Sequence, residues 1–235
     1  MRFANFIDYF SLPRIGRYLT ACSNDTKRCI KLYKSNLKVA QAFHPLLGLL
    51  EVVFRNGIND QLTSYFTDPD WIINQKAVFM VDPILTHINK KTGQVETNRF
   101  LLNSVKAAEK KLRKRGVGIT SGRIISEQTF GFWTDLFENH HYKILRGRPI
   151  KMFKNLPSGY GRTEILNELT KVRQFRNRIN HNEPICFVGT RIDFTNTSAV
   201  YNSIINLLKW ISPELVSWIK NIDKVQSTIT KAQSI

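Results

Sequence analysis

Apolar residues recur at intervals of three and four along most of the chain, which is the spacing of one face of an α-helix. The stretch 23–43 has this spacing, with Ser23 or Asn24 as the candidate N-cap. Because proline disfavours helix at the residue before it, Pro45 is expected to break or restart the helix. The stretch 45–66 then continues with one apolar face made of Leu47, Leu50, Phe54, Ile58 and Leu62.

The rest of the chain predicts further helices separated by short connectors. Asn98 and Gly116 are the candidate start and stop of one of them, and Ser126 is the candidate cap of the next. Residues 117–123 are expected to form a loop, and 184–194 could hold a short extended piece. No internal repeat and no long linker interrupts this pattern, so residues 1–235 are predicted to form one all-α domain. The further helices are expected at 82–93, 98–116, 125–145, 162–183, 197–211 and 213–230.

Length and composition indicate a folded globular protein. The chain has 235 residues, of which 42% are hydrophobic, enough for one substantial core. No apolar run reaches the eighteen residues of a membrane span, and the early charged residues argue against a signal peptide. The three cysteines show neither metal-site spacing nor an even number for disulfides, so they suit a reducing cytoplasm. We therefore expect a cytoplasmic protein.

A formal net charge of +17 suggests a polyanionic partner, and nucleic acid is the commonest one. The densest basic tract is residues 106–116, "KAAEKKLRKRG". A solvated helix face is the alternative for this tract, as it is for the histidines and basic residues of 140–148. The side chains expected to contact RNA are Lys110, Lys111, Arg113, Lys114, Arg115, Arg146, Arg148, Arg173 and Arg178.

The segment 173–184, "RQFRNRINHNEP", combines side chains that suit phosphodiester chemistry. Arg176 offers a planar donor fork that always carries its charge, so it can hold a phosphate. His181 titrates near neutrality and can move a proton to or from a ribose 2′-hydroxyl, while Asn177 can orient either group. Pro184 should end the helix, which places His181 in a less constrained last turn. The alternative is an ordinary helix C-terminus whose basic residues complement the dipole.

Three segments in order resemble a known family. The stretch 176–185, "RNRINHNEPI", is similar to the signature of the HEPN superfamily of ribonucleases and, more closely, of the Abi-like family of bacterial abortive-infection proteins. The stretch 49–62, "LLEVVFRNGINDQL", resembles that family's first signature helix, and 125–137, "ISEQTFGFWTDLF", its central segment. Family members often end the motif with two adjacent histidines, whereas this chain has His181-Asn182.

This resemblance implies an all-helical HEPN bundle with additional helices, a role in phage defence or a toxin–antitoxin system, and RNA as substrate or partner. It implies Arg176, Asn177 and His181 as catalytic residues and a homodimer that brings two motifs together. Since Glu51 and Arg55 stand one turn apart, they can pair, and Arg55 and Asn56 are expected to line the cleft of His181. The expected supporting residues are Glu51, Arg55, Asn56 and Asn180.

We therefore expect a metal-independent endoribonuclease that needs no cofactor and binds RNA but no membrane. The rival hypothesis is a defence protein that binds a structured small RNA without cleaving it. A third is a nucleotide-binding or nucleotidyl-transferring partner, since HEPN domains also bind nucleotides.

Overall fold

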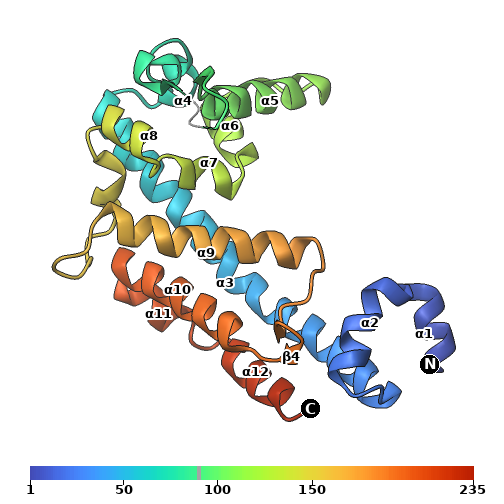
Figure 1. Cartoon of the computed structure of the whole chain (residues 1–235). Coiled ribbons are helices and arrows are strands. Elements are labelled where there is room, and N and C mark those ends of the chain that lie inside the picture. Colours follow the sequence, from blue (N-terminus) through green and yellow to red (C-terminus); the bar gives the residue numbers. More distant parts are fainter. Residues whose placement is uncertain (89–90) are drawn as a thin grey trace. The chain divides into compact units, whose positions relative to one another are not determined.

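The structure, a computed structural model, describes residues 1–88 and 91–235 and is mostly helical, as expected for an all-α protein (Figure 1). Its contacts divide the chain into two compact units, residues 1–50 with 171–235 and residues 51–170. The boundaries fall inside helices α3 (Thr26–Phe66) and α9 (Arg162–Asn180), so the units are joined by continuous helices rather than by a linker.

The first unit contains two stretches of chain that are far apart in sequence. The first half of α3 and the end of α9 both contribute to its core, where the Phe43 and Phe175 rings lie 4.7 Å apart. Tyr18 packs against both Tyr33 and Phe187 with ring centroids 5.2 and 5.0 Å away. Its other elements are α1 (Phe3–Phe10), α2 (Leu12–Ala21), β3 (Phe187–Val188), β4 (Arg191–Ile192), α10 (Thr195–Ile211), α11 (Pro213–Ile219) and α12 (Val225–Gln233).

The second unit is built around the rest of α3. Phe54 is fully buried there, 5.7 Å from the Phe130 ring and 5.8 Å from the Phe137 ring. Gly57 gives the helix room for a neighbour, because a Cβ at this position would lie 2.7 Å from Cε of Met152. The other elements are α4 (Trp71–Asn74), 3₁₀ turns η1 (Gln75–Ala77), η2 (Phe79–Val81), η3 (Pro83–Leu85) and η4 (Arg148–Met152), strands β1 (Thr86–Ile88) and β2 (Val95–Thr97), α5 (Phe100–Lys114), α6 (Ser121–Glu127), α7 (Phe130–Asp135) and α8 (Asn139–Ile144).

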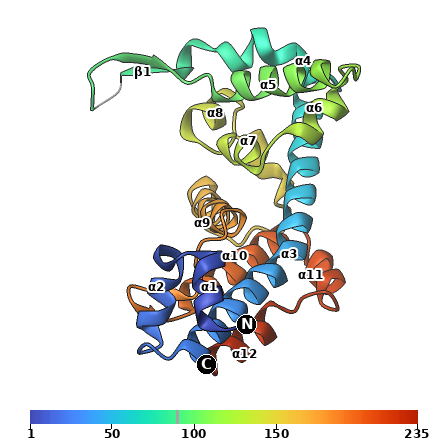
Figure 2. The same ribbon diagram turned by 90° about the vertical axis from the view of Figure 1, so that its right-hand side faces the viewer.

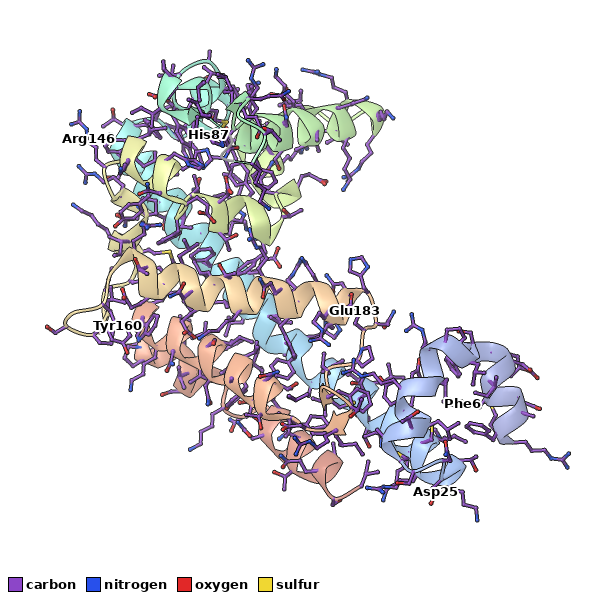
Figure 3. The ribbon with its side chains drawn as sticks, in the orientation of Figure 1. Phe6, Asp25, His87, Arg146, Tyr160 and Glu183 are labelled. Carbon is purple, nitrogen blue, oxygen red and sulfur yellow. The ribbon has the colours of Figure 1, made fainter. Side chains whose placement is uncertain are left out.

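Helix α3 shows one expectation confirmed and two that were wrong. The predicted apolar face of 45–66 is buried along its whole length. However, Pro45 lies inside the helix and does not break it. A proline there costs about 3 kcal/mol, and burial of Phe43 and Leu46 on either side offsets this at roughly 1.5–3 kcal/mol each. The cap is Asp25, whose carboxylate accepts the backbone N–H groups of Lys27 and Arg28, rather than Ser23 or Asn24 (Figure 3).

Three other elements differ from the pattern-based prediction. In place of a helix at 82–93, η3 leads into an antiparallel hairpin of β1 and β2, visible at the side of the second unit in Figure 2; residues 89–90 lie outside the described chain. The expected loop at 117–123 already enters α6, and the helix expected at 125–145 is divided among α6, α7 and α8. Ser126 is not a cap, because its hydroxyl donates to the carbonyl of Arg123.

The remaining expectations agree better. Helix α5 begins where the Asn98 side chain accepts the N–H of Phe100 and is followed by Gly116 in a left-handed conformation. The extended piece within 184–194 is the β3–β4 hairpin. The helix expected at 213–230 is instead two helices, α11 and α12.

By length and composition alone, α3 could cross a membrane, and a core helix of a soluble protein passes the same test. One third of the residues in its most apolar window are buried, so the test is weak evidence in either direction. Cytoplasmic localisation stays a prediction.

We expect Phe54→Ala to lower the free energy of unfolding by about 3–5 kcal/mol, because it leaves a cavity among buried aromatic rings. Val52→Ala on the same helix is the matched control, since Val52 is 44% exposed, and it should cost far less. Urea denaturation measures both variants. Equal losses would contradict the assignment of this helical face to the core.

Candidate functional site

Helix α9 positions the three residues of the motif at its end. Its apolar stripe is buried, as predicted, and consists of Ile165, Leu169, Val172, Phe175 and Ile179. Arg176 lies at the edge of this stripe and is half-buried, whereas Asn177 is exposed. The helix ends at Asn180, so His181 follows directly and is exposed. Along an ideal helix, Arg176 and His181 are about 7.5 Å apart in rise.

The backbone turn that carries His181 is fixed by hydrogen bonds, which corrects the expectation of a less constrained turn. The N–H of His181 donates to the carbonyl of Asn177 at 3.0 Å, and that of Glu183 to the carbonyl of Arg178 at 2.8 Å. Asn182 between them has φ +52°, a left-handed conformation that asparagine tolerates better than most residues. Glu183 marks this turn in Figure 3. The exposed imidazole therefore extends from a defined backbone.

Two arginines of α2, which the sequence analysis did not single out, hold the segment after the motif. The guanidinium of Arg14 donates to the carbonyl of Asn182 at 2.9 Å. Arg17 donates to the carbonyl of Gly189, and its guanidinium lies 4.6 Å from the centre of the Phe187 ring. A pocket of about 410 Å³ lies between α2 and this segment. Nothing in the sequence beyond their three-residue spacing could have indicated these arginines, because the contacts are tertiary.

A buried asparagine also anchors this segment from α3. Asn36 is 2% exposed, and its side-chain oxygen accepts the N–H of Ile185 at 2.8 Å. The hydroxyl of Thr197 donates to the carbonyl of the same residue. Both backbone polar groups of Ile185 are thus paired in a buried setting, where an unpaired group is costly.

The two arginines of α9 that are expected to contact RNA, Arg173 and Arg178, lie in different surroundings. Arg178 binds the segment that follows its helix: Nε lies 3.4 Å from a carboxylate oxygen of Glu183, and a terminal nitrogen donates to the carbonyl of Pro184. It also lines a pocket of about 350 Å³ together with Lys171 and Phe187. Arg173 is half-buried, and Asn180 is exposed. The proposed contacts of Arg173 and Arg178 with RNA stay predictions.

The supporting residues Glu51, Arg55 and Asn56 belong to the second unit, whereas the motif belongs to the first. Asn56 is exposed, and Glu51 and Arg55 are half-buried. Nε of Arg55 is buried and makes no hydrogen bond within the described residues. Participation of these three residues in the site stays a prediction.

The basic tract on α5 is partly neutralised by carboxylates. Glu127 binds Lys111 at 2.5 Å and Arg115 at 2.6 Å, and these hydrogen bonds lower the pKa of its carboxyl. Arg113 lies 3.8 Å from Glu109, which also binds Lys76. The five predicted contact residues are therefore not equivalent. Among the ion pairs of the described residues, none involves the exposed Lys110 and Lys114, which lie one helical turn apart.

The basic group around residues 140–148 is also divided between core and surface. His141 is fully buried, with Nδ1 3.0 Å from a carboxylate oxygen of Asp135, so it does not face solvent. Nε2 of His140 lies 2.9 Å from the Asn98 amide, and burial lowers the pKa of this imidazole. The guanidinium of Arg148 lies over the Tyr65 ring, 5.1 Å from its centre. Arg146, labelled in Figure 3, is exposed after α8.

Metal coordination is not suggested by the side chains that the structure describes. Within residues 1–88 and 91–235, no three His, Cys, Asp or Glu side chains gather closely enough to hold a metal ion. The independence of the chemistry from metal stays a prediction, as does the absence of a cofactor.

We expect Asn36→Ala to lower the free energy of unfolding by about 1–3 kcal/mol, because the buried N–H of Ile185 loses its acceptor. Asn202→Ala is the matched control, since Asn202 is exposed on α10 and should change stability little. Urea denaturation compares the two variants. If Asn36→Ala is as stable as the control, the anchoring role assigned to Asn36 is wrong.

Comparison with known proteins adds no relative to this description. The chain matches no family model, no curated protein and no solved structure.

Proposed function

We propose that this protein binds RNA and cleaves it as a metal-independent endoribonuclease. The observation that carries the proposal is the position of an exposed imidazole, His181, five residues after the half-buried Arg176 at the end of one helix. The net charge of +17 supports a polyanionic substrate. A role in phage defence or in a toxin–antitoxin system rests on the resemblance of three segments to the Abi-like family.

The chemistry of the proposed site follows from these side chains. A neutral His181 takes the proton of a ribose 2′-hydroxyl, whose oxygen attacks the adjacent phosphorus. The bond to the 5′-oxygen of the next nucleotide breaks, and this oxygen receives a proton from a second acid. Arg176 holds the phosphate as its charge grows, and Asn177 orients either partner. The products are a 2′,3′-cyclic phosphate and a 5′-hydroxyl, and DNA is spared because it lacks the attacking hydroxyl.

The second candidate function is RNA binding without cleavage. The observation that favours it is the exposure of His181 and Asn177, since a protein side chain at a reaction centre is usually shielded from water. In this case the same residues would hold a structured small RNA. Incubation with labelled RNA in the presence of a chelator distinguishes the two functions.

We expect His181→Ala to lower the rate of RNA cleavage by a factor of about 10²–10⁴, which is the usual contribution of a general acid or base. RNA affinity and helical content should be retained, because the side chain is exposed and its backbone turn is fixed by main-chain hydrogen bonds. The assay measures initial cleavage rates in chelator and identifies the ends of the products.

His44→Ala provides the control for this experiment. His44 is the other exposed histidine of the first unit and lies on α3, so its loss should leave the rate unchanged. Equal cleavage by His181→Ala and the parent protein would rule out the catalytic role of His181. RNA binding without any cleavage by the parent protein would favour the second candidate function.

We also infer that the active form is a two-fold dimer. Cleavage needs proton transfer at both the attacking and the leaving oxygen, and the motif offers one histidine per chain. Closed two-fold symmetry is the commonest way to supply a second copy.

Light scattering at micromolar concentration should therefore give twice the 27.2 kDa mass of one chain. The specific cleavage activity should fall on dilution as the dimer dissociates. A protein that is monomeric under these conditions, with cleavage activity independent of dilution, would rule out the dimer.

A further inference from the structure

A groove in the first unit gathers lysines from two helices that are far apart in sequence. The first half of α3 and the α12 region line it, and its volume is about 740 Å³. Both elements lie side by side near the C-terminus in Figures 1 and 2. The five lysines that line it are all exposed: Lys31, Lys34, Lys38, Lys224 and Lys231.

The charge of this groove is not balanced by its own lining. No aspartate or glutamate is among the side chains that line it, and none of the ion pairs of the described residues involves its five lysines. The carboxylates closest in sequence are already engaged. Asp25 caps α3, while Asp223 accepts hydrogen bonds from the Tyr201 hydroxyl at 2.7 Å and the N–H of Val225 at 2.9 Å. The groove is thus a concentrated site of positive potential, which attracts an anion.

The spacing of the lysines suits an extended polyanion better than a single small anion. Lys31 and Lys38 are seven residues apart on one helix, which is about 10 Å along its axis. Lys224 and Lys231 have the same separation along the α12 region. Each row of about 10 Å matches roughly three nucleotide steps of a helical strand, at about 3.4 Å per nucleotide.

The type of side chain also indicates what the groove recognises. All five charges are lysines, which act as mobile point charges and do not impose the bidentate geometry with which arginine binds a carboxylate or a phosphate. The rest of the lining is uncharged and consists of the apolar Ala42, Pro45, Ile222 and Ala232 and the polar Ser35, Gln41 and Thr228. Such a surface can contact sugar–phosphate backbone without reading base edges.

We propose that this lysine groove binds the sugar–phosphate backbone of an RNA strand. The proposal rests on the proposed RNA-binding function and adds to it a contact surface on the same unit as His181. The groove supplies affinity that is independent of sequence, whereas the motif at the end of α9 acts on the phosphodiester. Loss of the groove therefore weakens binding and leaves the chemistry of bound RNA unchanged.

The test compares two triple variants of the full chain that lose the same charge. Lys31→Gln, Lys34→Gln and Lys38→Gln remove the α3 row of the groove. Lys151→Gln, Lys154→Gln and Lys209→Gln are the matched control, because these three lysines are also exposed and do not line the groove. Affinity for a 20-nucleotide single-stranded RNA is measured over a range of salt concentrations.

In the groove variant, the slope of log affinity against log salt should become shallower by about 2, at roughly 0.7 for each phosphate contact that is lost. Its affinity for the RNA should fall about 10²-fold at 100 mM salt. The control should lose much less on both measures. Single-turnover cleavage at saturating protein should be the same in both variants and the parent. In addition, RNA should protect the five groove lysines from acetylation, as read by mass spectrometry.

Three outcomes would overturn the proposal and are distinguishable from one another. If the parent protein binds RNA but both triple variants bind equally well, RNA contacts lie elsewhere and only the groove assignment fails. If the parent protein does not bind RNA at all, the proposed function fails together with the groove. If a 20-residue polyglutamate protects the groove lysines and RNA does not, the groove binds an acidic protein segment instead.

Discussion

Burial of one apolar stripe along α3 is the interaction on which both units depend. Phe43, Leu46 and Leu50 belong to the core of the first unit, and Phe54, Ile58 and Leu62 to that of the second. Each of these side chains contributes roughly 1.5–3 kcal/mol when fully buried. This explains why the helix continues through Pro45, whose unfavourable effect is local, while the gain from burial extends on both sides.

The sequence pattern predicts the features of this fold that arise from local periodicity. The buried faces of α3 and α9, and the limits of α5, follow from spacing and capping residues within a few positions of one another. The prediction fails where the helical tendency of a segment competes with contacts to distant residues or with other hydrogen bonds within the segment. The helix expected at 82–93 is replaced by a hairpin. The segment expected as one helix at 125–145 is divided among three helices, and the buried Gln128 between the first two accepts a hydrogen bond from the Ser104 hydroxyl of α5.

In the candidate site, too, the features that are local in sequence can be predicted and those that depend on tertiary contacts cannot. Its motif can be read directly from residues 173–184, because Arg176, Asn177 and His181 are close in sequence. The residues that hold the turn and the following segment come from α2 and α3, and Asn36 is 149 residues away from the backbone group that it binds. A single sequence contains no signal for such a pair. The pattern of charges along the sequence has a similar limit. It predicts that Lys111 and Arg115 are available to bind RNA, whereas in the structure both form ion pairs with Glu127.

The discontinuity of the first unit has a consequence for how the protein is made. Residues 51–170 are inserted between the two parts of this unit, so the ribosome completes the second unit before it has made the end of α9. Bringing Asn36 and Ile185 together closes a loop that costs about 4 kcal/mol or more in chain entropy if the intervening chain is flexible, and a folded insertion shortens that loop. The turn that carries His181 therefore becomes ordered only late in synthesis. A chain that stops before residue 176 therefore contains the whole second unit without any part of the motif.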